Sequence, residues 1–96
     1  MDYSKKVSNI EDLTFERLLK KTDEGYMYSI YLGYYPEIKK MYKSPFNDEK
    51  TPSFNFYYKN NKLKFKDFSS NNSGTIVDLV MILFSLNYKE ALIKIN

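Results

Sequence analysis

The 96-residue sequence contains no cysteine and no histidine. Their absence excludes a disulfide framework, a thiol nucleophile, an imidazole base and an ordinary zinc site. Long apolar runs are also missing, because the longest one near the C-terminus, Ile76 to Leu86, contains Asp78 and Ser85 and is too short to span a bilayer. The first ten residues have no apolar signal-peptide core. We therefore expect a soluble protein of the cytoplasm without a membrane partner.

Glycine and proline are scarce, with three of each, whereas hydrophobic residues make up 43% of the chain and ten tyrosines and seven phenylalanines are present. This composition is typical of a globular protein and argues against disorder. A chain of this length forms one domain, which buries roughly 60 to 65% of the surface that the unfolded chain exposes. The expected core is small and rich in aromatic rings.

The net charge of +3 is unevenly distributed along the chain. Residues 38–66 contain eight lysines against two acidic residues, which gives this segment a net charge of +6. The segment before it carries −2 and the segment after it carries −1. The middle third is therefore a candidate surface for binding a polyanion.

The N-terminal third has the pattern of two helices. Residues 1–9 are polar and are expected to be a flexible N-terminus, which precedes a single module over residues 10–96. Apolar residues at helical spacing, with acidic residues early and lysines late, predict a helix over residues 10–21. Asp23 can cap a second short helix that ends at Gly33. The aromatic and β-branched content of this second stretch leaves a strand as the alternative.

The middle of the chain has the pattern of a β-hairpin. A short strand over Ile38 to Lys43 and a polar turn are expected before it. Two runs of alternating residues, 53–59 and 62–66, flank Asn60 and Asn61, which tolerate the left-handed backbone of a two-residue turn. The alternation predicts a core face made of Phe54, Phe56, Tyr58, Leu63 and Phe65, and an opposite face made of Asn55, Tyr57, Lys59, Lys62, Lys64 and Lys66.

The C-terminal third predicts a loop followed by two helices. Serines and asparagines from residue 69 to Gly74 form the loop, and Thr75 with Asp78 resembles a capping box at the start of a helix that is apolar nearly all round. Asn87 with Glu90 repeats this signal for a last short helix. We therefore expect an α+β fold in which a small antiparallel sheet with a central hairpin packs against N-terminal and C-terminal helices.

Two stretches, SPFNDEKTPSF (residues 44–54) and FKDFSSNNSGTIVDLV (residues 65–80), resemble the zinc-binding domain of bacterial and phage DNA primases. In that family, a Cys-Pro-x-His motif precedes Glu-Lys-(Thr/Asn)-Pro-Ser-Phe, a hairpin, a Cys-x-x-Cys pair, a glycine-rich turn and an apolar helix. Residues 49–54 match the second of these motifs without a gap, and the likeness extends from about residue 42 to residue 95. The positions that fall at the expected offsets after it are Gly74, Ile76, Asp78, Val80, Glu90 and Ala91.

The resemblance implies a zinc-ribbon-like fold, but none of the family's zinc ligands is present. We call the four positions where the ligands would lie the ligand-matching positions; they are Ser44, Asn47, Asp67 and Ser70. Three neutral side chains and one carboxylate are a poor set for zinc, so we predict no zinc and no other cofactor, with Mg²⁺ at Asp67 as a weak alternative. Phe46, Phe68, the aromatic hairpin and hydrogen bonds between polar side chains are expected to hold the fold instead.

The resemblance also implies a role in engaging single-stranded template DNA. Ammonium groups that pair with phosphates and a ring that stacks on bases are what such a site needs. The predicted DNA-binding residues are Lys62, Lys64, Lys66, Lys59, Tyr57, Lys50 and Lys43. Of these, Lys50 matches the family motif directly, and shaping of the turn is the alternative role for it. A solvated strand face is the alternative interpretation of the lysines on the hairpin.

Primer synthesis requires a cluster of carboxylates that holds two metal ions, and the acidic residues of this chain are scattered. We therefore expect no catalysis by the chain alone. It would act as an accessory module of a primase or DNA polymerase whose catalytic subunit lies in trans or on further sequence, in replication of a phage, plasmid or mobile element. The alternative is a protein-interaction adaptor that grips a polymerase or helicase through the tyrosines at positions 26, 28, 31, 34 and 35 and through the terminal helices.

Overall fold

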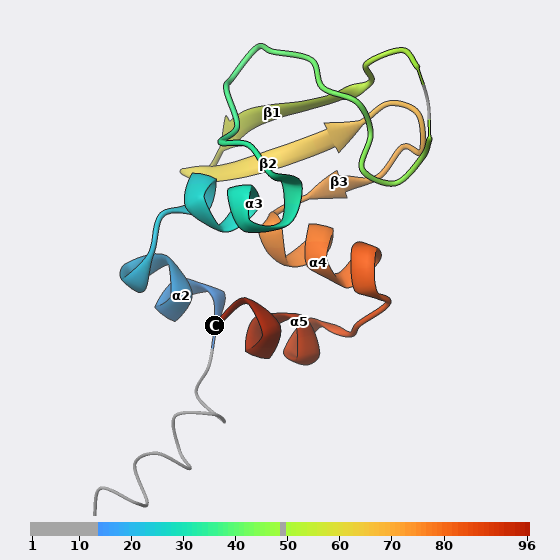
Figure 1. The fold of residues 1–96 in the computed structure, drawn as a ribbon. Helices are drawn as coiled ribbons and strands as arrows, with labels where there is room; N and C mark the ends of the chain where they lie inside the picture. Colours follow the sequence, from blue (N-terminus) through green and yellow to red (C-terminus); the bar gives the residue numbers. More distant parts are fainter. Residues whose placement is uncertain (1–13, 49) are drawn as a thin grey trace, which may run out of the picture.

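The computed structural model describes residues 14–48 and 50–96. Within them the fold is α+β, with helices at both ends of the described chain and one three-stranded antiparallel sheet in the order β1-β2-β3 (Figure 1). The elements are α2 (Phe15–Lys21), α3 (Glu24–Leu32), β1 (Phe54–Lys59), β2 (Lys62–Asp67), β3 (Ser73–Gly74), α4 (Ile76–Phe84) and α5 (Tyr88–Ile95). The predicted fold class is confirmed.

The helices α2 and α3 each begin at a residue whose polar side chain accepts a hydrogen bond from a free N–H group of the first turn. The Thr14 hydroxyl accepts from the Arg17 N–H at 3.2 Å, and the Asp23 carboxylate accepts from the Tyr26 N–H at 3.0 Å. Gly33 ends α3 in the left-handed conformation with φ 86°. The second predicted helix is therefore confirmed, and the strand alternative for this stretch is wrong. The predicted flexible residues 1–9 and the first residues of the helix predicted over 10–21 lie outside the described residues.

The predicted hairpin forms with the expected turn. Strands β1 and β2 pair with Phe56 opposite Phe65 and Tyr57 opposite Lys64. Asn60 and Asn61 have φ angles of 55° and 62°, which are the positive values that a two-residue turn of this kind requires. Strand β3, which the sequence did not predict, adds two residues to the other edge of β2.

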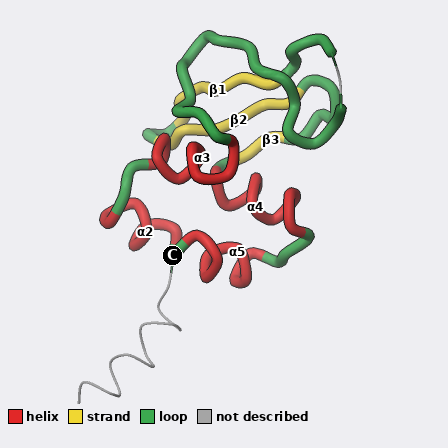
Figure 2. The backbone as a smooth tube through the Cα atoms, in the orientation of Figure 1, coloured by secondary structure: helices red, strands yellow, loops and turns green. Residues whose placement is uncertain are grey.

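Two expectations for this region are wrong. Ile38 to Lys43 is not a strand, because Lys39 turns the chain with φ 71° and only Tyr42 forms an isolated bridge to Phe54. Tyr58, expected on the core face, leaves 65% of its surface exposed, although Leu63 directly opposite it is buried. The long connection that contains the bridge arcs past β1 (green in Figure 2).

The last two helices begin as the sequence predicts. The Asp78 carboxylate accepts from the backbone N–H of Thr75 at 2.8 Å, and the Glu90 carboxylate accepts from the N–H of Asn87 at 2.9 Å. Gly74 is needed before the first of them, because its φ is 149° and a Cβ at this position would collide with the Asp78 carboxylate.

The core lies between one face of the sheet and the helices. Figure 1 shows α3 and α4 beside the sheet, with α2 and α5 in the next layer. Tyr28 of α3 is fully buried, stands edge-on to Phe56 with ring centroids 5.0 Å apart and donates its hydroxyl to the Leu63 carbonyl at 2.9 Å. The first half of α4 is buried, whereas Ile82 and Phe84 at its end are exposed although the helix is apolar nearly all round. Within the described residues, no helix combines the length and hydrophobicity needed to cross a membrane.

Candidate nucleic-acid interface

The face of the hairpin that points away from the core carries most of the predicted DNA-binding residues. The β1–β2 register pairs Lys59 with Lys62, Tyr57 with Lys64 and Asn55 with Lys66, and side chains of directly paired residues lie on the same face of a sheet. We call this surface the lysine face; its residues are Asn55, Tyr57, Lys59, Lys62, Lys64 and Lys66. The structure therefore brings five of the seven predicted DNA-binding residues together.

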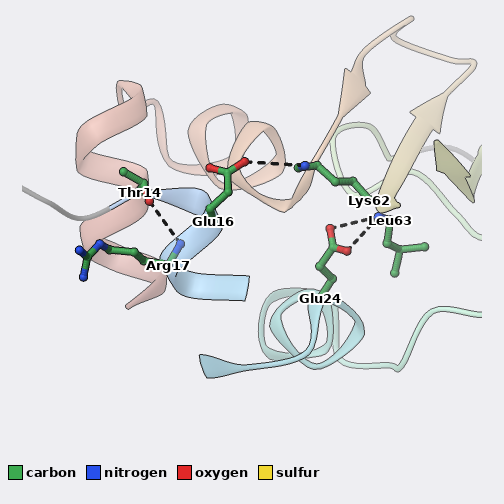
Figure 3. A network of polar contacts seen from close by, with 6 residues as sticks. All are labelled: Thr14, Glu16, Arg17, Glu24, Lys62 and Leu63. Carbon is green, nitrogen blue, oxygen red and sulfur yellow. Dashed lines mark hydrogen bonds and ion pairs between the residues drawn. The ribbon is translucent and has the colours of Figure 1, made fainter. Parts of the chain in front are cut away.

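The positive charge of this face is partly compensated at the end near the hairpin turn. Figure 3 shows Lys62 reaching toward Glu16 of α2, and the ammonium and carboxylate groups are 3.8 Å apart. Close by, both oxygens of Glu24 accept from the backbone N–H of Leu63, at 3.0 and 3.1 Å. Burial raises the pKa of Glu24 above its usual value, although the Leu63 N–H and the Lys62 charge act in the opposite direction. An exposed ion pair of this kind contributes little to stability. The carboxylates of Glu16 and Glu24 nevertheless lie near Lys62 and reduce the positive potential there.

The other end of the lysine face has a different environment. The Lys66 ammonium donates to the Asn71 side-chain oxygen at 2.7 Å and lies 5.8 Å from the centre of the Phe68 ring, both of which are neutral partners. No ion pair is recorded for Lys64 or Lys66 among the described residues. Lys59 likewise has no ion pair there, so the lysines of this face without an acidic partner among the described residues are Lys59, Lys64 and Lys66. Of these, Lys64 and Lys66 lie together on β2.

The two remaining predicted residues, Lys43 and Lys50, are exposed on the long connection before β1. Lys43 follows the bridge between Tyr42 and Phe54, beside the edge of the sheet. Lys50 follows position 49, which lies outside the described residues, and no recorded contact joins it to the lysine face. These two residues extend the basic region but are not brought into its centre.

The ligand-matching positions converge at the opposite end of β2 from the hairpin turn. Three of them meet directly, because the hydroxyls of Ser44 and Ser70 donate to the Asp67 carboxylate at 2.8 and 2.5 Å. The fourth joins through a neighbour, since the Asn47 amide donates to the Ser69 hydroxyl at 2.9 Å. Residues that are up to 26 positions apart therefore form one polar cluster, as expected for positions that hold a common centre.

Two further serines, which sequence reasoning missed, complete this group. The hydroxyls of Ser53 and Ser69 donate to the Asp67 carboxylate at 3.0 and 2.9 Å. We call Ser44, Ser53, Asp67, Ser69 and Ser70 the Asp67 cluster. Both additional serines lie within the two stretches that resemble the primase domain, but only the folded chain brings them to the same carboxylate.

Asp67 is fully buried, and no cation is recorded beside it among the described residues. Burial by itself would raise the pKa of this carboxyl, but the hydrogen bonds from the cluster hydroxyls, with Ser70 and Ser44 the strongest, outweigh it and hold the pKa below its usual value. The carboxylate is therefore ionised at neutral pH and is stabilised by hydroxyl dipoles.

The donor chemistry of this cluster does not fit zinc. Within the described residues, no three His, Cys, Asp or Glu side chains lie close enough together to hold a metal ion. One carboxylate and several neutral hydroxyls lack the thiolate or imidazole ligands that a zinc site uses. The hydroxyl protons are also directed at the carboxylate oxygens that a metal ion would need.

The two phenylalanines beside the ligand-matching positions differ in their surroundings. Phe46 packs against Phe54 and Phe65, with ring centroids 6.1 and 5.8 Å apart, so its predicted role in holding the fold is confirmed. Phe68 leaves 62% of its surface exposed, so the same expectation for Phe68 is wrong. The strand alternation that ends at Asp67 turns the next side chain toward the lysine face instead of the core.

The tyrosines of the N-terminal half divide into packed and exposed groups. Tyr28 is buried, and Tyr34 stacks on Tyr42 with ring centroids 4.1 Å apart. Tyr26 and Tyr35 are more than half exposed. A groove of about 250 Å³ lies beside Tyr26 and is lined by Leu18, Lys21, Thr22, Met27, Ile30, Ile95 and Asn96.

A scan against protein-family models and searches of curated proteins and of solved structures found no match to this chain.

Proposed function

We propose that this protein is a non-catalytic module that binds single-stranded DNA through the lysine face and supports a primase or DNA polymerase. The observation that carries the proposal is the position of Tyr57 directly opposite Lys64, with further lysines before and after it on the same face. This arrangement alternates positive charge with an aromatic ring on a surface that the core does not use. A binding site for a flexible polyanion with stacking bases has this composition.

The physical basis of binding would be electrostatic attraction combined with stacking. Each lysine that neutralises a phosphate releases a condensed counterion, so affinity should fall as salt concentration rises. A tyrosine ring stacks on any base, so binding should show little sequence preference. The ligand would be unpaired DNA, because the Tyr57 ring can stack only on a base that is not already stacked inside a duplex.

The link to primases is supported by the Asp67 cluster. In the resembling domains, the ligand-matching positions meet at one metal ion; in this chain Ser44 and Ser70 meet at the Asp67 carboxylate, and Asn47 joins them through Ser69. We propose that the scaffold is retained while hydrogen bonds replace the metal. On this basis the module delivers template to a catalytic partner, in trans or on further sequence, in the cytoplasm of a cell that carries a phage, plasmid or other mobile element.

The proposal can be tested by fluorescence anisotropy with a labelled oligothymidylate. The charge reversal Lys64→Glu plus Lys66→Glu should weaken binding at least tenfold at low salt and reduce the salt dependence by about two counterions. The matched control is Lys20→Glu plus Lys89→Glu, which changes the net charge equally on exposed helix positions away from the sheet. Equal losses in both variants would show a nonspecific charge effect and would contradict the proposal.

A second function, a protein-interaction adaptor, is favoured by one observation. The groove of about 250 Å³ has an apolar floor of Leu18 and Met27, and Tyr26 and Ile30 stand exposed beside it. Exposed aromatic and aliphatic side chains around a groove are typical of a protein contact. Replacing Tyr26 and Ile30 by Ser should abolish capture of a polymerase or helicase if this function is correct, and should leave binding of oligothymidylate unchanged.

A further inference from the structure

Phe68 lies in the turn directly after β2, and its ring does not pack into the core. It leaves 62% of its surface exposed, whereas Asp67 beside it is fully buried. A single exposed phenylalanine is common in proteins and by itself indicates nothing. For Phe68, however, the fixed backbone and the neighbouring side chains indicate a binding role.

The backbone on both sides of Phe68 is firmly held. The Phe68 N–H donates to the Ser53 carbonyl at 2.8 Å, and the Asn71 N–H donates to the Asp67 carbonyl at 2.7 Å, which closes the turn. The neighbouring Ser69 hydroxyl is bound to the Asp67 carboxylate at 2.9 Å. The ring is therefore presented to solvent from a fixed turn, so that little conformational entropy remains to be lost when a ligand covers it.

The ring also lies on the same side of the sheet as the lysine face. The Lys66 ammonium is 5.8 Å from the centre of the Phe68 ring. Tyr57 lies opposite Lys64, which is four residues before Phe68; at the rise of a strand this separation is at most about 13 Å along the sheet. Tyr57 and Phe68 thus lie beside Lys64 and Lys66, neither of which forms an ion pair within the described residues.

We infer that Phe68 is a base-stacking platform of this surface, with Lys64 and Lys66 holding the phosphates between its base and the base on Tyr57. This inference rests on the proposed function, since it names how the same face takes its ligand. It also gives the Asp67 cluster a role, because the cluster fixes the turn that presents the ring. The ligand is a short segment of unpaired bases, taken without regard to sequence.

A fluorescent substitution reports stacking directly. The sequence has no tryptophan, so Phe68→Trp creates a single indole whose emission reports only on this site. Adding unlabelled oligothymidylate should quench this emission, because a stacked base is an efficient quencher of an indole. The matched control is Phe84→Trp, since Phe84 is also partly exposed and lies 4.4 Å from a lysine ammonium, that of Lys94, but belongs to α4. Its emission should not change.

Affinity measurements separate stacking from charge. Phe68→Leu should weaken binding of oligothymidylate by about 5- to 100-fold, whereas Phe84→Leu should have no effect. On an oligonucleotide of abasic sites, which retains the phosphates, Phe68→Leu and the wild type should bind equally. Because the ring is exposed, the Tm of the Phe68→Leu variant should stay within about 3 °C of the wild-type value.

The outcomes distinguish this inference from the proposed function. If Phe68→Leu binds oligothymidylate as tightly as the wild type while Lys64→Glu plus Lys66→Glu weakens binding, Phe68 is not a stacking platform. The proposal that the lysine face binds single-stranded DNA is then still supported. An unquenched Phe68→Trp that retains wild-type affinity leads to the same conclusion. If the wild type does not bind at low salt, both proposals are overturned.

Discussion

Replacing the Asp67 carboxylate is the change that most directly tests whether hydrogen bonds of the Asp67 cluster hold this end of the fold together. Asp67→Ala removes the acceptor of four hydroxyl groups at once, from Ser44, Ser53, Ser69 and Ser70. Of these residues only Ser44 is buried. Its hydroxyl would keep the hydrogen bond that it accepts from the Phe46 N–H at 3.1 Å, but the proton that it donates would lose its acceptor in a dry environment, whereas the other three serines are exposed enough to meet water.

The expected loss follows from these surroundings. A buried hydroxyl left without a partner costs about 1 to 3 kcal/mol, and hydrogen bonds to a charged group that water can replace contribute much less each. We therefore expect Asp67→Ala to lower the free energy of unfolding by about 3 kcal/mol. For a domain of this size, the loss corresponds to a fall in Tm of roughly 12 to 24 °C.

Thermal and urea unfolding followed by far-ultraviolet circular dichroism would measure this loss. The matched control is Asp48→Ala, which removes an exposed carboxylate from the connection before β1 and should change stability by less than about 0.5 kcal/mol. If both variants unfold at the same temperature, hydrogen bonding to Asp67 does not stabilise the fold, and the view that the cluster stands in for a metal is wrong.

Three further predictions concern the same scaffold. The folded-state pKa of Asp67 lies below its unfolded-state value, so the stabilising effect of its carboxylate should be present above about pH 4 and lost as the pH falls through the folded-state pKa. The Tm difference between the wild type and Asp67→Asn should therefore shrink as the pH is lowered from 7 to 2. Asn61→Gly should raise the free energy of unfolding by about 0.5 kcal/mol in urea titrations, because φ 62° suits glycine better than asparagine; an unchanged midpoint would contradict this. Introducing the ligands of the primase zinc domains that the sequence resembles should create a site that binds one zinc ion per chain by metal analysis and raises Tm in a chelator-sensitive way, unlike the wild type. Failure to bind zinc would contradict the proposed correspondence of these positions. That variant carries Ser44→Cys, Asn47→His, Asp67→Cys and Ser70→Cys.

Local signals in the sequence were sufficient for most of the secondary structure. Asp23 and Gly33 bracket α3, and Asn60 with Asn61 fixes the hairpin, because each of these residues acts on backbone groups only a few positions away. The strand predicted over Ile38 to Lys43 failed for a related reason, since the left-handed turn at Lys39 has no glycine or asparagine to announce it.

The candidate site was predictable in part. Strand alternation alone placed Tyr57 and the lysines of β2 on one face, and the register of the hairpin confirms that arrangement. The pairing of Lys62 with Glu16 was not predictable, because it depends on how α2 packs against the sheet. The exposure of Phe68 and the gathering of Ser53 and Ser69 around Asp67 depend likewise on the folded turn.

The most direct test of the central proposal is a titration of the ¹⁵N-labelled protein with oligothymidylate, followed residue by residue through amide chemical shifts. We predict that the largest shifts fall on β1 and β2, at Tyr57, Lys64 and Lys66, and continue into Phe68, and that they diminish as salt is added. Absence of shifts at low salt, or shifts confined to the groove beside Tyr26, would contradict the proposal that the lysine face binds single-stranded DNA.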